Sequence, residues 1–96
     1  MYDYHLCRDD CLLGTLCATH GEMFWSYGTF EATEEFEEFR PLFERELKLL
    51  NADQMDEWQT VWDEIFSLGI YLRLKGKNIT EFVLHIDGQK AWWRYQ

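Results

Sequence analysis

The sequence predicts an α+β fold in which an antiparallel β-sheet of about four to five strands carries a two-helix hairpin packed on one face. The expected order of elements is β-β-α-α-β-β. Three observations favour this fold: strand-like runs before residue 31, apolar residues at helical spacing over 33–68, and alternation of apolar and polar residues over 70–95. A chain of 96 residues has room for one small domain, 1–96.

The first elements are expected to be strands. Leu12–Ala18 and Met23–Phe30 have strand-like composition, and Thr19–Glu22 between them has turn chemistry. A further strand is expected near Tyr2–Cys7. Gly28, inside the run Met23–Phe30, indicates a bulge or the close approach of a neighbouring strand.

Helical periodicity begins after residue 33. One apolar stripe consists of Phe36, Phe39, Phe43, Leu47 and Leu50, and the next of Met55, Trp58, Trp62, Ile65 and Phe66. Pro41 predicts a short helical turn at about 34–39, followed by a main helix with this proline in its first turn. Thr33 is placed to cap the first turn.

The two predicted main helices lie near 38–50 and 53–68, and their short linker favours an antiparallel hairpin. Gly69 stands just past the second helix, where glycine commonly ends a helix. We expect this hairpin to cover one face of the sheet. The predicted core is Phe39, Phe43, Leu47, Trp58, Trp62 and Ile65 against Leu72, Leu84 and Trp93.

The last part of the chain predicts strands again. Lys75–Asn78 has turn chemistry after a strand that begins at Ile70. Ile79–Ile86 and Lys90–Tyr95 flank Asp87-Gly88, a dipeptide typical of a two-residue hairpin turn. The cross-strand pairs expected from that turn are Leu84–Ala91, Phe82–Trp93, His85–Lys90, Val83–Trp92 and Glu81–Arg94.

Charge is segregated along the chain. The net charge is −9, which disfavours nucleic acid as a partner. Residues 31–64 hold 12 acids and 3 bases, whereas the remaining residues hold 6 of each. The acidic helical face includes Glu34, Glu35, Glu37 and Glu38. It is interpreted either as a solvated face that keeps the protein soluble or as a docking surface, including one that mimics nucleic-acid phosphates.

Five potential metal ligands occur early in the chain, at His5, Cys7, Cys11, Cys17 and His20. Their spacing lacks the close cysteine pairs of structural zinc sites, so no metal is expected. A Cys–His nucleophile pair lacks the local signals that activate a thiol. No glycine-rich phosphate loop occurs, so no cofactor is expected.

The compartment and the membrane are also constrained by composition. Three cysteines without a signal peptide favour a reducing cytoplasm. No apolar run is long enough for a membrane span, so no membrane partner is expected.

A candidate interaction surface follows from the predicted alternation. If the helices cover one face of the sheet, the other face exposes apolar and aromatic side chains rimmed by charge, which is typical of an interface. The residues of this surface are Val83, His85, Trp92, Arg73, Lys90 and Arg94. A second copy of the chain, forming a homodimer through the sheet, or another protein is the expected partner.

The sequence therefore favours a small acidic cytoplasmic protein that acts as a non-enzymatic interaction or regulatory module. One alternative is a small enzyme or ligand-binding domain with a site lined by Trp25, Trp92, His85 and a cysteine. Another is an acidic mimic of nucleic acid that inhibits a nucleic-acid-binding protein. These three hypotheses differ in the surface that carries the function.

Overall fold

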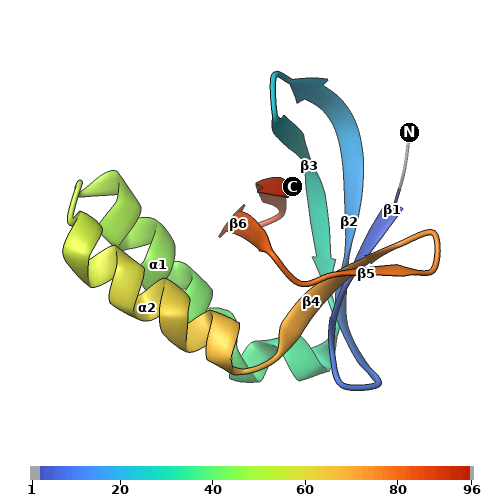
Figure 1. The fold of residues 1–96 in the computed structure, drawn as a ribbon, viewed down its shortest axis with the longest axis horizontal. Coiled ribbons are helices and arrows are strands. Elements are labelled where there is room, and N and C mark those ends of the chain that lie inside the picture. Colours follow the sequence, from blue (N-terminus) through green and yellow to red (C-terminus); the bar gives the residue numbers. More distant parts are fainter. Residues whose placement is uncertain (1–2, 96) are drawn as a thin grey trace.

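The structure, a computed structural model, describes residues 3–95. One antiparallel sheet of seven strands curls on itself, and a helical hairpin packs beside it (Figure 1). The strands are β1 (Asp3–Arg8), β2 (Cys11–Glu22), β3 (Trp25–Ala32), β4 (Ile70–Leu74), β5 (Lys77–Ile79), β6 (Phe82–Asp87) and β7 (Lys90–Tyr95). The helices are η1 (Glu34–Glu38), α1 (Arg40–Asn51) and α2 (Met55–Ser67). The predicted α+β class is confirmed.

The sheet has seven strands, so the expected four to five is wrong. Their order across the sheet is β5-β4-β1-β2-β3-β7-β6. The predicted strand Ile79–Ile86 is in fact two strands, β5 and β6, which lie at opposite ends of this order. The break falls at the exposed pair Thr80 and Glu81. Lys75 and Gly76, both with positive φ, fold β5 back onto β4, while β6 pairs with β7.

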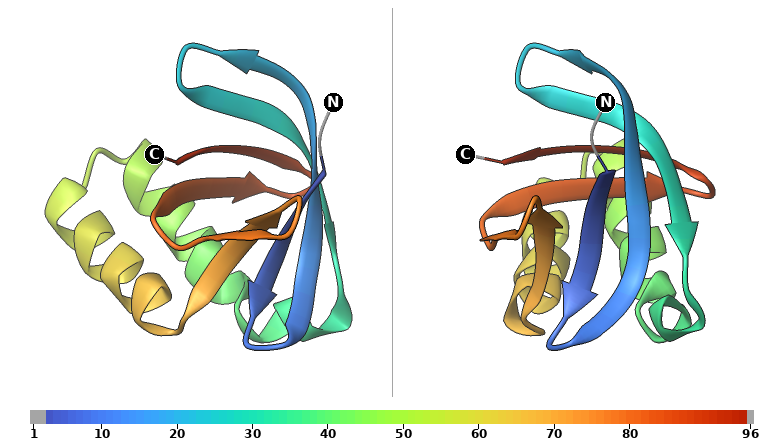
Figure 2. Two further views of the ribbon diagram at one scale, coloured as in Figure 1. Left: turned by 45° about the vertical axis from the view of Figure 1, so that its right-hand side comes forward. Right: turned by 90° about the vertical axis from the view of Figure 1, so that its right-hand side faces the viewer.

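The first hairpin is longer than predicted. β2 runs through the expected turn at Thr19–Glu22, and the chain reverses at Met23 and Phe24 instead. A bulge near Ala18 bends β2, and beyond it the strand stays paired with β3 to its end. The hairpin projects past the other strands (Figure 2). The strand expected near Tyr2–Cys7 is β1, and Tyr2 lies outside the described residues.

The helical hairpin is confirmed. A single turn of 3-10 helix, η1, precedes α1, and Pro41 lies in the first turn of α1. Gly69 follows α2 with a φ of 76°. Thr33 occupies the expected cap position, but its hydroxyl donates to the carbonyls of Leu12 and Leu13 instead of bonding the helix. Within residues 3–95, no helix has the length and apolar character needed to cross a membrane.

In the β6–β7 hairpin, each side chain lies on the predicted face of the sheet, but the pairing of residues between the strands differs from the prediction. The loop is Gly88-Gln89, with Gly88 at a φ of 62°, and not Asp87-Gly88. All five expected pairs are therefore wrong; the observed pairs include Leu84–Trp93, His85–Trp92 and Val83–Arg94. Since the partner of each residue changes by two positions along the opposite strand, each side chain keeps its face of the sheet.

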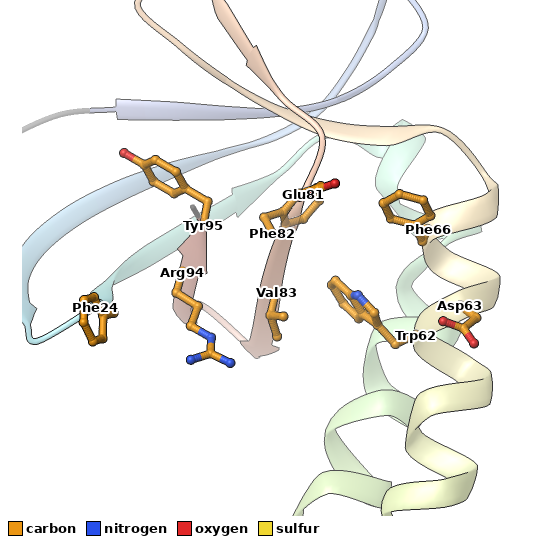
Figure 3. Close-up of a pocket in the computed structure, with 9 residues that line it drawn as sticks. All are labelled: Phe24, Trp62, Asp63, Phe66, Glu81, Phe82, Val83, Arg94 and Tyr95. Atoms are coloured by element: carbon orange, nitrogen blue, oxygen red, sulfur yellow. The ribbon is translucent and has the colours of Figure 1, made fainter.

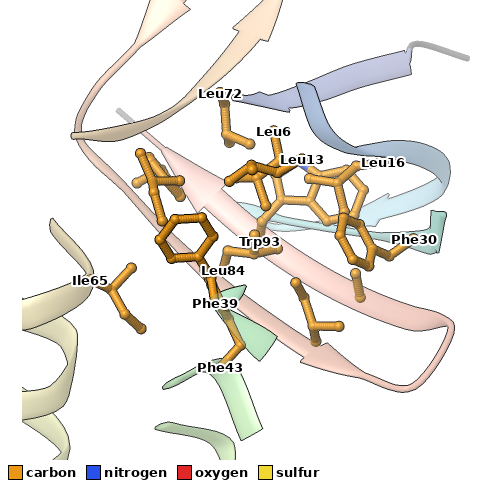
Figure 4. Packing of buried hydrophobic residues seen from close by; sticks show 14 of the residues in the cluster. Leu6, Leu13, Leu16, Phe30, Phe39, Phe43, Ile65, Leu72, Leu84 and Trp93 are labelled. Atoms are coloured by element: carbon orange, nitrogen blue, oxygen red, sulfur yellow. The ribbon is translucent and has the colours of Figure 1, made fainter. Parts of the chain in front are cut away.

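The core lies inside the curl of the sheet and is closed by the helices. Trp93 is completely buried at its centre, among side chains of β1, β2 and β6 (Figure 4). Consecutive ring contacts then lead from β3 through η1, α1 and α2 to β6; they join Phe30, Phe36, Phe43, Trp62 and Phe82. The predicted core is confirmed, except that Trp58 is half-buried.

β2 and β3 approach each other closely at Gly28. A Cβ added there would lie 1.9 Å from the carbonyl oxygen of Cys17 on β2. Only glycine allows the two backbones to approach this closely. The close approach expected at Gly28 is therefore confirmed.

Candidate functional site

His85 of β6 lies on the face of the sheet that the sequence places opposite the core. It is nevertheless only 3% exposed. Three tryptophans surround its ring: the centroid of Trp92 on β7 lies 5.5 Å away, that of Trp25 on β3 5.7 Å, and that of Trp58 on α2 6.5 Å. The expectation that His85 is exposed is wrong, because side chains of the helices and of β3 cover this part of the face.

The polar partner of His85 is Glu46 of α1, which is completely buried. Nδ1 of His85 donates a hydrogen bond to Oε1 of Glu46, and Nε1 of Trp58 donates to the same oxygen over 2.9 Å. Oε2 of Glu46 has no hydrogen-bond partner among the described residues. One carboxylate therefore joins α1, α2 and β6 inside the protein.

This cluster corresponds in part to the predicted site lined by Trp25, Trp92, His85 and a cysteine. The histidine and both tryptophans meet, but the cysteines lie on β1 and β2, which β3 and β7 separate from β6 in the sheet. Burial raises the pKa of the Cys7 thiol, and also that of Cys17. A raised pKa lowers the thiolate fraction, so neither thiol has the character of an activated nucleophile.

Of the other residues of the predicted interaction surface, Arg73 lies apart from those on the paired strands β6 and β7. Val83 and Trp92 are half-buried, and Arg73, Lys90 and Arg94 are exposed. Val83 and Arg94 are paired across β6 and β7. Arg73 lies on β4, which is not a neighbour of β6 or β7 in the sheet. The continuous open face expected from the sequence is therefore not formed.

A cleft lies beside this face, between α2 and the β6–β7 hairpin (Figure 3). Its volume is about 770 Å³, within the range of roughly 300–1,000 Å³ that is common for ligand pockets. Trp62, Asp63 and Phe66 come from α2, and Phe24 from the turn between β2 and β3. The remaining lining residues are Glu81, Phe82, Val83, Arg94 and Tyr95.

The lining of the cleft is unusually apolar for an exposed surface. Phe24 is 80% exposed, Phe66 53% and Tyr95 37%. Met23, beside Phe24 at the hairpin tip, is 92% exposed. Single exposed apolar residues are ordinary, whereas a group of them around a concave surface is typical of a binding site. The cleft is therefore the strongest candidate site.

Three charged residues line the same cleft. Asp63 and Glu81 are exposed acids, and Asp63 accepts a hydrogen bond of 2.9 Å from the amide of Gln59. Arg94 is the basic residue of the lining, and its guanidinium carbon lies 5.1 Å from the centre of the Trp25 ring. The charge of Arg94 is thus partly engaged by an aromatic ring of the chain itself.

Val83 and Arg94 belong both to the predicted interaction surface and to the cleft, but the cleft itself is not predicted from the sequence. Phe66 is assigned to an apolar helix stripe, and Phe24 to the middle of a strand. One signal was available: Met23 and Phe24 are large apolar residues next to a run with turn chemistry. Their position at the hairpin tip leaves both side chains exposed.

The predicted acidic face lies away from this cleft. Glu34, Glu35, Glu37 and Glu38 are all exposed and lie on η1. The hydrogen bond from Arg40 holds the pKa of the Glu37 carboxyl below its usual value. The exposure of the four carboxylates on η1 is as expected for an acidic face.

The five potential metal ligands, from which no metal site is expected, are distributed along β1 and β2. Cys11 is at the start of β2, paired with Arg8, and Cys17 pairs with Asp3 and Thr29. Within residues 3–95, no three His, Cys, Asp or Glu side chains gather in a metal-binding arrangement. Comparison of the chain with known protein families, with curated proteins and with solved structures finds no match.

Proposed function

We propose that the protein is a non-enzymatic interaction module that binds a partner protein in the cleft between α2 and the β6–β7 hairpin. The observation that carries this proposal is the grouping of Phe24, Phe66 and Tyr95, all well exposed, around one concave surface. These residues come from three separate parts of the chain, and the fold holds them together.

The energetics favour an apolar occupant. Covering one side chain of the size of Phe contributes roughly 1.5–3 kcal/mol relative to leaving it in water. Phe24 and Phe66 together therefore offer a substantial part of the free energy of a specific complex. Aromatic anchors in a pocket with a polar rim are typical of the residues that dominate protein–protein affinity.

The buried cluster supports the same proposal indirectly. Glu46 and His85 do not line the cleft, but His85 is two residues from Val83, a lining residue on the same strand. Trp92 is the partner of His85 across β6 and β7. Fixing β6 to both helices keeps the two walls of the cleft at a constant separation. A preformed site loses less conformational entropy on binding.

Site-specific photocrosslinking tests the proposal. Benzoylphenylalanine replaces Phe66 in one variant, and in a control variant it replaces Glu35, an exposed residue of η1 outside the cleft. We expect a discrete adduct from position 66 and none from position 35. The captured protein is then purified, and its binding to the unsubstituted chain is compared with its binding to Phe24→Ala/Phe66→Ala.

The outcomes separate the possible occupants. Loss of binding in the double variant supports a partner protein in the cleft. An adduct between two copies of the chain would instead make the cleft a homodimer interface, and sedimentation of the unsubstituted protein would show the dimer. Equal adducts at both positions, or binding that Phe24→Ala/Phe66→Ala does not weaken, would overturn the proposal.

A further inference from the structure

We infer that the cleft selects a basic amphipathic segment, in which apolar anchors are flanked by Lys or Arg. This inference rests on the proposed function and specifies the chemistry of the partner. Two features of the molecule carry it: the exposed aromatic lining described above, and the distribution of charge around that lining.

Every charged residue of α2, the helical wall of the cleft, is acidic. α2 carries Asp56, Glu57, Asp63 and Glu64 and contains no Lys or Arg. All four side chains are exposed, and Asp63 lines the cleft itself. An acidic segment approaching this wall would be repelled, whereas a basic one would be attracted and oriented.

The opposite wall of the cleft carries one acidic and one basic side chain. Glu81 lines the cleft just before β6, next to Phe82. Arg94 is the basic residue of the lining, and it lies over the ring of Trp25, so part of its interaction capacity is already used. The lining therefore carries two acids and one base around an apolar floor, so the net charge that faces an occupant is negative.

The floor determines the rest of the partner's chemistry. Phe66 and Trp62 lie on α2, across the cleft from Phe82 and Val83 (Figure 3). Lys and Arg alone would leave the exposed ring of Phe66 in water, whereas aromatic or aliphatic anchors would cover it. A segment with both kinds of residue satisfies the floor and the rim together.

Selection from a random peptide library tests the inference without assuming a sequence. Short random peptides are selected on the unsubstituted protein and counter-selected on Phe24→Ala/Phe66→Ala, so that only cleft-dependent binders remain. Both residues are exposed, so this double variant is expected to fold. We expect the surviving peptides to be enriched in Lys and Arg beside aromatic or aliphatic residues.

A charge reversal tests the rim directly. Asp63→Lys/Glu81→Lys changes the net charge by four units, and Glu34→Lys/Glu35→Lys changes it equally on η1. We expect the first variant to weaken a selected peptide about tenfold and the second less than about twofold. Raising the salt from about 0.1 M to 1 M should remove most of this difference, because the Debye length falls from about 10 Å to 3 Å.

The outcomes distinguish this inference from the proposal on which it rests. Cleft-dependent peptides that are neutral or acidic would overturn the inference and leave the cleft as a binding site. Equal effects of the two charge reversals would overturn it as well. If no cleft-dependent peptide is found, the inference fails, and the photocrosslinking at Phe66 decides separately whether the cleft binds a protein.

Discussion

Glu46 and His85, 39 residues apart in the chain, form a buried hydrogen bond that joins α1 to the edge strand β6. The same carboxylate oxygen accepts the indole hydrogen of Trp58 on α2. Buried polar groups need hydrogen-bond partners, because an unpaired buried polar group is costly. The cluster therefore acts as a polar link between the helical hairpin and the sheet.

Removal of the Glu46 carboxylate should destabilise the protein strongly. In Glu46→Leu, the donors of His85 and Trp58 lose their acceptor inside the protein, which should lower the free energy of unfolding by at least about 2 kcal/mol. Glu44→Leu is the matched control, because Glu44 is an exposed acid of the same helix. Urea denaturation measures both variants. Similar losses in the two would show that the buried bond contributes little.

Trp62 is expected to be the most important side chain of the helical hairpin. It is 7% exposed and contacts the rings of Phe43 and Phe82. Trp62→Ala should cost roughly 3–5 kcal/mol, enough to unfold much of a marginally stable domain. Phe66→Ala, one turn further along α2, should cost less than about 1 kcal/mol because Phe66 is exposed. Thermal unfolding measures the loss of stability in both variants. Equal losses would contradict the burial of Trp62 between Phe43 and Phe82.

Local sequence patterns suffice to predict the helical hairpin. Pro41, the stripe at helical spacing and Gly69 act within a few residues of their own positions. The structure confirms Pro41 and Gly69. It confirms most of the stripe, but Met55 and Phe66 are exposed. The break between β5 and β6 could not be predicted in this way. Apolar residues continue to alternate on both sides of Thr80, and only pairing with different partners separates the two strands.

The candidate site depends on contacts that no local pattern specifies. Alternation places His85 correctly on the face opposite Leu84, but the path of α1 decides that Glu46 covers it. The cleft similarly combines a hairpin tip, one helix and two strands. The bulge near Ala18 bends β2 before the tip that carries Phe24, and no local pattern in the sequence specifies that bend.

The early cysteines and histidines are predicted not to hold a metal. We expect the purified protein to contain no stoichiometric zinc and Cys11→Ser to fold normally. One equivalent of zinc, released when the thiols are modified, would contradict this prediction. Alkylation should also be slower at buried Cys7 than at half-buried Cys11, since burial raises the pKa of the Cys7 thiol.

Gly28→Ala should damage the fold of the first hairpin. The added Cβ would lie 1.9 Å from a carbonyl oxygen of β2, and relieving this contact requires the strands to separate. We expect a loss of at least about 2 kcal/mol in the free energy of unfolding. Gly21→Ala is the control, because its Cβ would lie 3.5 Å from the carbonyl of Trp25, an ordinary contact. A loss below about 0.5 kcal/mol at Gly28 would show that β2 and β3 adjust easily.

The protein is expected to lose stability at alkaline pH because of Tyr4. Burial and the neighbouring hydroxyl of Tyr95, 3.1 Å away, raise the pKa of the Tyr4 phenol to about 12. In the unfolded chain this pKa is about 10. The folded state therefore holds the phenolic proton more tightly, and the resulting stability is complete below pH 10 and is lost as the pH rises toward 12.

The slope of stability against pH isolates this effect. Urea denaturation between about pH 9 and pH 11 should show a decline in the free energy of unfolding that is smaller in Tyr4→Phe, which has no phenol to ionise. Tyr95→Phe keeps the buried Tyr4 but removes its hydroxyl neighbour, so it should show an intermediate slope. The slope of Tyr95→Phe is intermediate because burial, which this variant keeps, is the larger cause of the raised pKa. If the slope of Tyr4→Phe equals that of the unsubstituted protein, other groups cause the alkaline loss.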